Sequence, residues 1–222
     1  LKTQSFVYYI YITICYIMIY IIITTSINNK VGVKNNIHRQ IRYIECINNL
    51  LQLINNDSNI KRIVVENNGV RQTYLDDLKC DICYTNNNMI EYKHKAENEL
   101  LDIKEVINQY NIKDEDIIIK LTGRYKLLNL NFINLVKTNN ERDAFVKFFN
   151  VCTKKYMFDD CVLGLFAVKC KYLKEFKYNF LKSPECEFAD YIRKNVDKNK
   201  LKELHQLDLE CCFADNLRIL VV

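Results

Sequence analysis

The residues best suited to chemistry in this sequence follow a run of three isoleucines at positions 117–119. They are Lys120, Thr122, Gly123 and Arg124. A charge at the end of a buried strand is costly unless it is paired, so two cations there predict a partner of opposite charge. A lysine and an arginine suit a pyrophosphate, and a glycine between them lets the backbone approach such a ligand closely.

Polar residues also follow other apolar runs. Thr24 and Thr25 come after the run that ends at residue 23, and Glu66 and Asn67 come after the Ile-Val-Val run at 63–65. The carboxylate of Glu66 can accept hydrogen bonds from a ribose hydroxyl or a base N–H. Because ligands of open α/β sheets bind beyond the carboxyl ends of the strands, we expect these residues and the 120–124 loop to form one ligand-binding edge.

Each of these residues also has a purely structural interpretation. Lys120 and Arg124 could form ion pairs with nearby acids, and Glu66 could cap a turn. Arg39 and Arg42 precede them in the chain and could face either the same ligand or solvent, with solvent the favoured prediction. The residue types alone leave these alternatives open.

The elements that must position these residues alternate along the chain. Short β-branched runs predict strands at about 19–24 and near residues 64, 83 and 118. Helices are predicted over 97–110, in a short segment at 75–78, and from residue 37, capped by Asn35 or Asn36. This last helix has Ile or Leu at 37, 41, 44, 47, 51 and 54. The alternation predicts an α/β fold, a mostly parallel sheet flanked by helices on both faces.

Composition limits the class of protein. The 222 residues are 49% hydrophobic and 27% charged, which predicts a packed core and excludes a disordered chain. The net charge of +5 is modest and spread along the chain, so no nucleic-acid partner is expected. The ten cysteines fall mostly in apolar runs, and the pair Cys80 and Cys83 lacks a second pair for zinc. We therefore expect core thiols in a reducing, cytoplasmic compartment.

The amino-terminal region has two competing interpretations. Residues 6–23 carry no charge and are just long enough to span a membrane. The second half of this run also fits a buried parallel strand, and one segment cannot be both. We favour a strand at 19–24, with residues 1–17 as a hydrophobic extension or anchor. Membrane association through residues 6–23 stays the alternative.

Taken together, the runs IIITTSI, RIVVENNG, DIIIKLTGRY and FDDCVLGLFA resemble nucleotide-sugar glycosyltransferases of the GT-A fold. The similarity is greatest to uncharacterised members from large DNA viruses, which would place the protein in the host cytoplasm. The resemblance implies a Rossmann-like GT-A domain over 18–222, with a nucleotide-binding half at 18–128 and an acceptor half at 129–222. It also implies a nucleotide-diphosphate sugar as donor and a glycan or protein as acceptor.

The resemblance assigns roles to particular residues. In several inverting branches an acidic pair, two residues and an aliphatic-Gly supply the catalytic carboxylate, and Asp159, Asp160, Leu163 and Gly164 match this pattern. Asp160 is then the best base, with Asp159 beside it. The donor nucleotide and diphosphate would be held by Thr24, Thr25, Glu66, Asn67, Lys120, Thr122, Gly123 and Arg124.

The sequence departs from the family in its metal motif. Most GT-A enzymes hold a divalent metal with Asp-x-Asp, but here Asp114 and Asp116 precede their strand, at the wrong end of the sheet. We expect no required cofactor, with manganese possible but not favoured, and an inverting reaction. The alternative is a non-catalytic nucleotide- or glycan-binding module on a degenerate GT-A fold.

Overall fold

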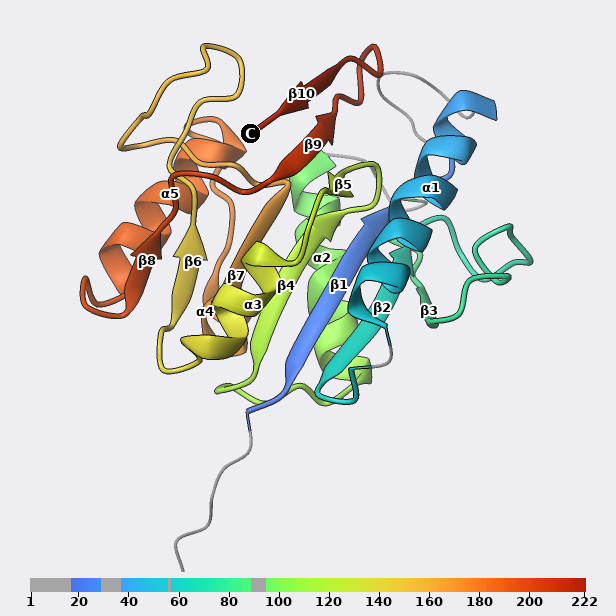
Figure 1. Cartoon of the computed structure of the whole chain (residues 1–222), viewed down its shortest axis with the longest axis horizontal. Helices are drawn as coiled ribbons and strands as arrows, with labels where there is room; N and C mark the ends of the chain where they lie inside the picture. The colour runs from blue at the N-terminus through green and yellow to red at the C-terminus, as the bar shows by residue number, and fades with distance from the viewer. Residues whose placement is uncertain (1–16, 29–36, 56, 89–94) are drawn as a thin grey trace, which may run out of the picture.

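The computed structural model describes residues 17–28, 37–55, 57–88 and 95–222. In this part of the chain a seven-stranded sheet has the order β3-β2-β1-β4-β7-β6-β8 (Figure 1). The pairs β1–β2, β1–β4, β2–β3 and β6–β8 are parallel, while β7 is antiparallel to β4 and to β6. The predicted mostly parallel sheet is therefore confirmed. Its strands are β1 (Ile19–Thr25), β2 (Ile60–Glu66), β3 (Asp81–Tyr84), β4 (Ile117–Thr122), β6 (Ala144–Val146), β7 (Leu165–Lys169) and β8 (Leu201–Glu203).

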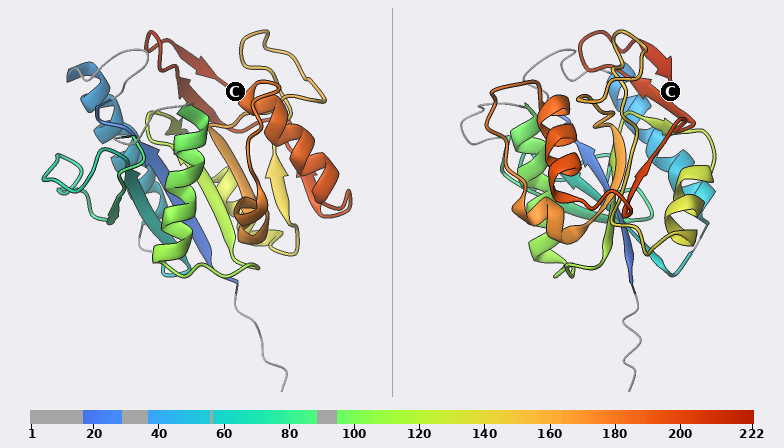
Figure 2. Two further views of the ribbon diagram at one scale, coloured as in Figure 1. Left: turned by 180° about the vertical axis from the view of Figure 1, so that it is seen from behind. Right: turned by 90° about the vertical axis from the view of Figure 1, so that its left-hand side faces the viewer.

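Helices cover both faces of this sheet, as predicted (Figures 1 and 2). The helices α1 (Ile37–Ile54) and α3 (Asn131–Thr138) share one apolar core with the sheet. The helices α2 (Lys95–Gln109), α4 (Cys170–Glu175) and α5 (Pro184–Asn195) share the core on the opposite face. The α/β fold class is confirmed.

A small antiparallel sheet lies beside α1, above the carboxyl edge of the main sheet (Figure 1). It has the order β10-β9-β5, formed by β5 (Lys126–Leu127), β9 (Leu209–Cys212) and β10 (Ile219–Val221). Arg42 of α1 forms a 2.7 Å ion pair with Glu210 of β9, and Asn49 donates to the Leu127 carbonyl. These contacts hold β5 and β9 of the small sheet against α1.

Strand β1 explains the uncharged amino-terminal run. Ile21 and Ile23 pack into one core and Ile22 into the other, and all three are fully buried. A central strand needs apolar side chains on both faces, so its sequence reads as a continuous hydrophobic run. Residues 19–23 are therefore part of the sheet. Residues 1–16 lie outside the described residues, and among the described helices none is both long and apolar enough to span a bilayer.

Two local predictions were wrong. The segment at 75–78 forms turns, not a helix, although Leu75 and Leu78 are buried. In α1 the apolar face was also wrong at its first two positions, because Ile37 and Ile41 are 59% and 44% exposed, whereas Ile47 and Ile54 are buried. The buried side chains of α1 are Arg39, Tyr43, Cys46, Ile47, Leu50 and Ile54.

The described cysteines carry free thiols, and most of them are buried. Burial raises the pKa of Cys46 to about 12 and that of Cys80 to about 11. These thiols behave as small apolar core groups, in line with the sequence prediction.

Candidate functional site

The strand order creates a crevice between β1 and β4. The chain passes from β1 to β2 and β3 in one direction and then places β4 on the other side of β1. Such a switch point leaves the two carboxyl ends uncovered, and this is where open α/β sheets bind ligands. Thr24 lies opposite Thr122 across the crevice, and Thr25 lies opposite Glu66. A cleft of about 580 Å³ opens there.

Lys120 lies at the bottom of this cleft and is held by three partners. It is 2% exposed, and its Nζ donates to Thr122 Oγ1 and the Leu163 carbonyl, both at 2.8 Å, and pairs with Glu99 Oε1 at 2.9 Å. An ammonium has three N–H donors, so all are used. Burial acts to raise the pKa of Glu99, but Lys120 and the hydroxyl of Thr24 together lower it. The pair is held ionised, as the structural alternative for Lys120 predicted.

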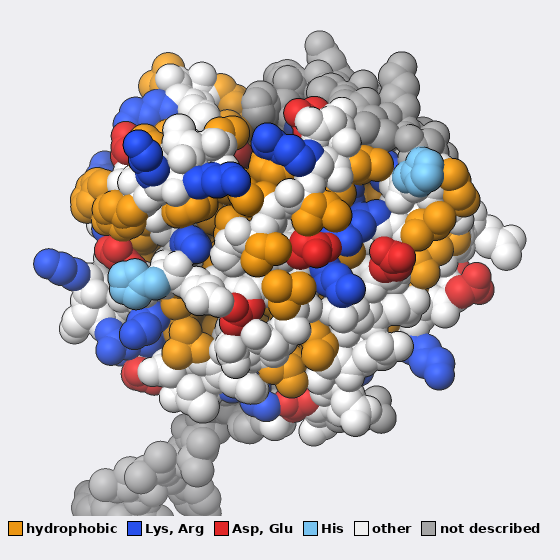
Figure 3. Space-filling view, turned by 45° about the horizontal axis from the view of Figure 1, so that its top comes forward, with side chains coloured by type: hydrophobic (Ala, Val, Ile, Leu, Met, Phe, Trp, Pro, Cys, Tyr) orange, Lys and Arg blue, Asp and Glu red, His pale blue; other side chains and the backbone are white. Residues whose placement is uncertain are grey.

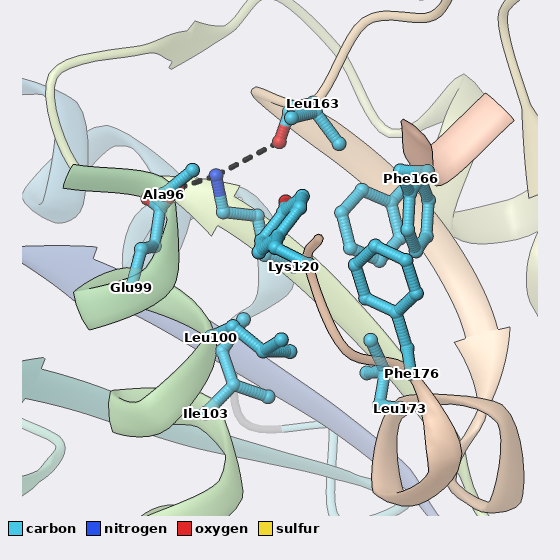
Figure 4. A pocket seen from close by; sticks show the side chains of 11 residues that line it. Ala96, Glu99, Leu100, Ile103, Lys120, Leu163, Phe166, Leu173 and Phe176 are labelled. Atoms are coloured by element: carbon cyan, nitrogen blue, oxygen red, sulfur yellow. Dashed lines mark hydrogen bonds and ion pairs between the residues drawn. The ribbon is translucent and has the colours of Figure 1, made fainter. Parts of the chain in front are cut away.

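Figure 4 shows why this ammonium cannot turn away from its partners. Its Nζ points to the Leu163 carbonyl and to Glu99 on α2, while apolar side chains surround the space below. A cavity of about 20 Å³ lies there, room for about one water molecule. The cavity is bordered by Leu100, Ile103, Leu163, Phe166, Leu173, Phe176, Tyr178 and Phe188.

Arg124 differs from Lys120 in its unused donors. It is 5% exposed and lines the cleft. Its Nε donates to the Cys212 carbonyl at 3.3 Å and its Nη1 to the hydroxyl of Tyr43 at 3.4 Å. A guanidinium has five N–H donors, and no ion pair of Arg124 with a carboxylate is found among the described residues. Arg124 therefore retains N–H groups for an anionic ligand.

Arg39 joins Arg124 in the cleft wall through Tyr43. Arg39 is 1% exposed and donates from Nη2 to the Tyr43 hydroxyl at 3.1 Å. Burial lowers the pKa of Arg39, and the nearby positive charge of Arg124 lowers it further. The prediction that Arg39 and Arg42 face solvent was wrong, because Arg39 is buried and Arg42 pairs with Glu210. An anion between the two buried guanidinium groups would relieve their repulsion.

Gly123 is required by packing. A Cβ there would lie 2.9 Å from Thr25 Cγ2 and 3.0 Å from the ring of Tyr43. Its backbone N–H donates to the Thr24 carbonyl at 2.9 Å. Gly123 is not among the residues that line the cleft, so its missing side chain serves the contact between β1, α1 and the 122–124 turn.

Glu66 is buried below the cleft, with its oxygens already bound to protein. Its carboxylate accepts from the Thr25 hydroxyl at 2.9 Å, from the Ile27 N–H, and from Asn68 and Arg71. This network fixes the turn after β1. Thr24, Thr25 and Asn67 line the cleft, whereas Glu66 does not.

One wall of the cleft comes from α2. Lys95 lies at the start of the helix. Desolvation of its ammonium and, second, the positive charge of Arg124 lower its pKa to about 8. Further along lie Asn98 and Asp102. Burial raises the pKa of Asp102 to about 6, although three side chains donate hydrogen bonds to it.

The opposite wall carries carboxylates from the second half of the chain. Asp160 is 6% exposed and lines the cleft, and its Oδ2 accepts from Asn150 Nδ2 at 2.6 Å. No hydrogen bond to its Oδ1 is found among the described residues. Asp159 is exposed and outside the lining. Glu185 of α5 also lines the cleft, while Glu187 instead binds backbone N–H groups of the 179–182 loop.

The charges at the end of β4 suit an anion. Lys120 and Arg124 are cations, and cations do not coordinate a divalent metal ion. Asp116 lies at the other edge of the sheet, where its Oδ1 accepts from the Met18 N–H. Within the described ranges no group of three His, Cys, Asp or Glu side chains is arranged to hold a metal ion. Viewed toward the carboxyl edge, the described surface mixes basic, acidic and hydrophobic side chains (Figure 3).

Sequence reasoning favoured solvent for Arg39 and missed several other cleft residues. Arg39 and Tyr43 lie four residues apart on the buried stripe of α1, and that stripe continues through Ile47 and Leu50. This second helical spacing was the available signal, but the isoleucines at 37, 41 and 44 suggested a different face. Lys95, Asn98 and Asp102 lie on a helix whose apolar pattern was recognised but whose polar face gave no indication of the cleft.

No protein-family model matches the chain, and no curated protein matches it by sequence. Solved structures do match its fold. TarS 1-349 from S. aureus, in complex with UDP-GlcNAc, has a TM-score of 0.51 and 14% identity, covering 85% of this chain and 56% of TarS 1-349. The mannosyltransferase PcManGT from Pyrobaculum calidifontis, in complex with GDP-Man and Mn²⁺, has a TM-score of 0.51 and 11% identity, with coverages of 84% and 54%.

A cytidylyltransferase from Leptospira borgpetersenii has a TM-score of 0.50 and 11% identity, covering 93% of this chain and 82% of the other. These similarities concern the fold. The chain thus has a mixed α/β fold with a mostly parallel central sheet, matching that of GT-A-like nucleotide-sugar transferases.

Proposed function

We propose that the protein is a glycosyltransferase that moves a sugar from a nucleotide-diphosphate sugar to an acceptor hydroxyl. The observation that carries this proposal is Arg124, a buried guanidinium at the carboxyl end of β4 with N–H groups left over for the cleft. Arg39 and Lys95 add positive charge to the same end of the cleft. A diphosphate has the charge and the paired oxygens that such a cluster binds.

The reaction would need no divalent metal. As the bond from the anomeric carbon to the diphosphate oxygen breaks, its electrons pass to the diphosphate. Arg124, Arg39 and Lys95 would stabilise that charge from fixed positions in a partly enclosed cleft. Lys120 would contribute through its charge only, since its three N–H groups already have partners.

Asp160 is the proposed base. Asn150 fixes one of its oxygens, and the other has no partner among the described residues. It would take the proton of the acceptor hydroxyl while that oxygen forms its bond to the anomeric carbon. Attack opposite the leaving diphosphate inverts the configuration. Asp159 is exposed, so we assign it no part in this step.

The test is binding and turnover with a panel of UDP-, GDP- and CMP-linked sugars, with EDTA or manganese. We expect one of them to raise the melting temperature in EDTA and to be turned over slowly in the absence of acceptor. Binding without turnover, unchanged in Asp160→Asn, would favour a non-catalytic nucleotide- or glycan-binding module. A folded protein that binds no nucleotide would refute the transferase proposal.

A further inference from the structure

The amide of Asn98 is an unsatisfied group in the wall of the cleft. Asn98 is 5% exposed and lines the cleft, and its Nδ2 has no hydrogen-bond partner among the residues that the structure describes. A buried donor without an acceptor destabilises a fold, so native proteins rarely keep one without a reason. A ligand that presents an acceptor atom at this point supplies the missing partner.

Asp102 lies one helical turn further along the same face of α2. It is 1% exposed, and its Oδ1 accepts from the Thr85 hydroxyl at 2.6 Å and from Asn87 Nδ2 at 2.8 Å. Within the described ranges, its Oδ2 accepts from Asn67 Nδ2 alone, at 2.9 Å. A carboxylate oxygen has two acceptor sites, so Oδ2 retains one. Positions i and i+4 are neighbours on a helix surface, so the side chains of Asn98 and Asp102 lie on one face of α2.

The chemistry of this wall selects among the parts of a sugar nucleotide. A phosphate only accepts hydrogen bonds, and the charge of Asp102 would repel it. A base needs an apolar or aromatic plane to stack on, and the aromatic residues of the lining, Tyr43, Tyr125 and Phe213, belong to other elements. A hydroxyl both donates and accepts. Two neighbouring hydroxyls can therefore use both groups at once.

We propose that Asn98 and Asp102 form a diol-binding subsite and that Asn98 is a specificity-determining residue. One hydroxyl of the diol accepts from Asn98 Nδ2, and its neighbour donates to Asp102 Oδ2. The hydrogen bonds from Thr85, Asn87 and Asn67 hold the carboxylate in place for this contact. The diol belongs either to the ribose or to the transferred sugar. This inference rests on the proposed function.

The experiment compares wild type with Asn98→Leu, a substitution of similar size that removes the donor, and with Asn108→Leu as the matched control. Asn108 is an exposed asparagine on the same helix, away from the cleft. The ligands are UDP, GDP, their glucose and mannose derivatives, and the 2′,3′-dideoxy diphosphates. Affinity is measured by calorimetry and stability by thermal melting, with Asn98→Ala as a second variant should Asn98→Leu not fold.

We expect Asn98→Leu to melt no lower than wild type without ligand and to bind the cognate ligand about tenfold more weakly. If the diol is the ribose, UDP and GDP show this loss as well as their sugar derivatives, and the dideoxy compounds bind variant and wild type equally. If it belongs to the transferred sugar, only the sugar nucleotides show the loss. Both results support the subsite and identify its source.

Equal affinity of wild type and variant for every ligand would overturn the inference while leaving the proposed function intact. A ligand-free melting temperature well below that of Asn108→Leu would also overturn it, because the amide would then already have a partner. Failure of the wild type to bind any nucleotide would refute the proposed function and this inference with it.

Discussion

Replacing Lys120 by Met tests whether this lysine stabilises the fold or awaits a ligand. The ammonium is 2% exposed and the side chain of its partner Glu99 is 26% exposed. Removing one member of a buried ion pair costs about 3–5 kcal/mol, because the other charge is left without compensation. Since Glu99 keeps part of its contact with solvent and a hydrogen bond from Thr24, we expect the free energy of unfolding to fall by an amount near the lower end of this range, about 3 kcal/mol.

The free energy of unfolding is measured by urea titration, with thermal melting in parallel. For a chain of this size about 3 kcal/mol corresponds to a fall of about 6–12 °C in melting temperature. The double variant Lys120→Met/Glu99→Leu removes both charges and should recover much of the loss. A loss below about 1 kcal/mol in the single variant would refute the reasoning, because the ammonium would then behave as a solvated surface charge.

Three further predictions concern the cleft. Because Lys95 has a pKa near 8 and a bound diphosphate raises it, nucleotide affinity should fall as the pH rises above about 8. Lys95→Met should abolish this fall in calorimetric titrations. Gly164→Ala places a Cβ against the ring of Tyr125, so it should lower the free energy of unfolding by about 1–3 kcal/mol in urea titrations. Asp160→Asn should reduce kcat by about 10²–10⁴-fold with little change in nucleotide affinity. Asp159→Asn, at an exposed position, should keep the kcat and the affinity of wild type. Equal losses of kcat in the two variants would contradict the assignment of Asp160 as the base.

The fold could be predicted because its strands are locally consistent. The run of isoleucines in β1 and the run in β4 each read as a strand buried on both faces, and the intervening helical spacing fixes their parallel direction. The polar strand ends then follow from topology, since parallel strands end at one edge. Thr24, Thr25, Asn67, Thr122 and Arg124 all line the cleft that this edge forms.

The roles within the site were harder to predict, because they depend on partners distant in sequence. Lys120 and Arg124 are both cations at the end of β4. The N–H groups of Lys120 are taken up by partners such as Glu99 and the Leu163 carbonyl, whereas Arg124 keeps free N–H groups. Glu66 looks like a ligand-binding carboxylate, but the turn after β1 uses its oxygens. The pairing of acids with cations is decided by tertiary packing, which spacing does not report.

The most direct test of the central claim is the affinity of Arg124→Met for the cognate sugar nucleotide in EDTA. Arg142→Met, at the far edge of the sheet, is the control for loss of an arginine. We predict that wild type and Arg142→Met bind in EDTA with equal affinity and that Arg124→Met binds at least about tenfold more weakly. Binding that requires manganese, or that is unchanged in Arg124→Met, would contradict the account.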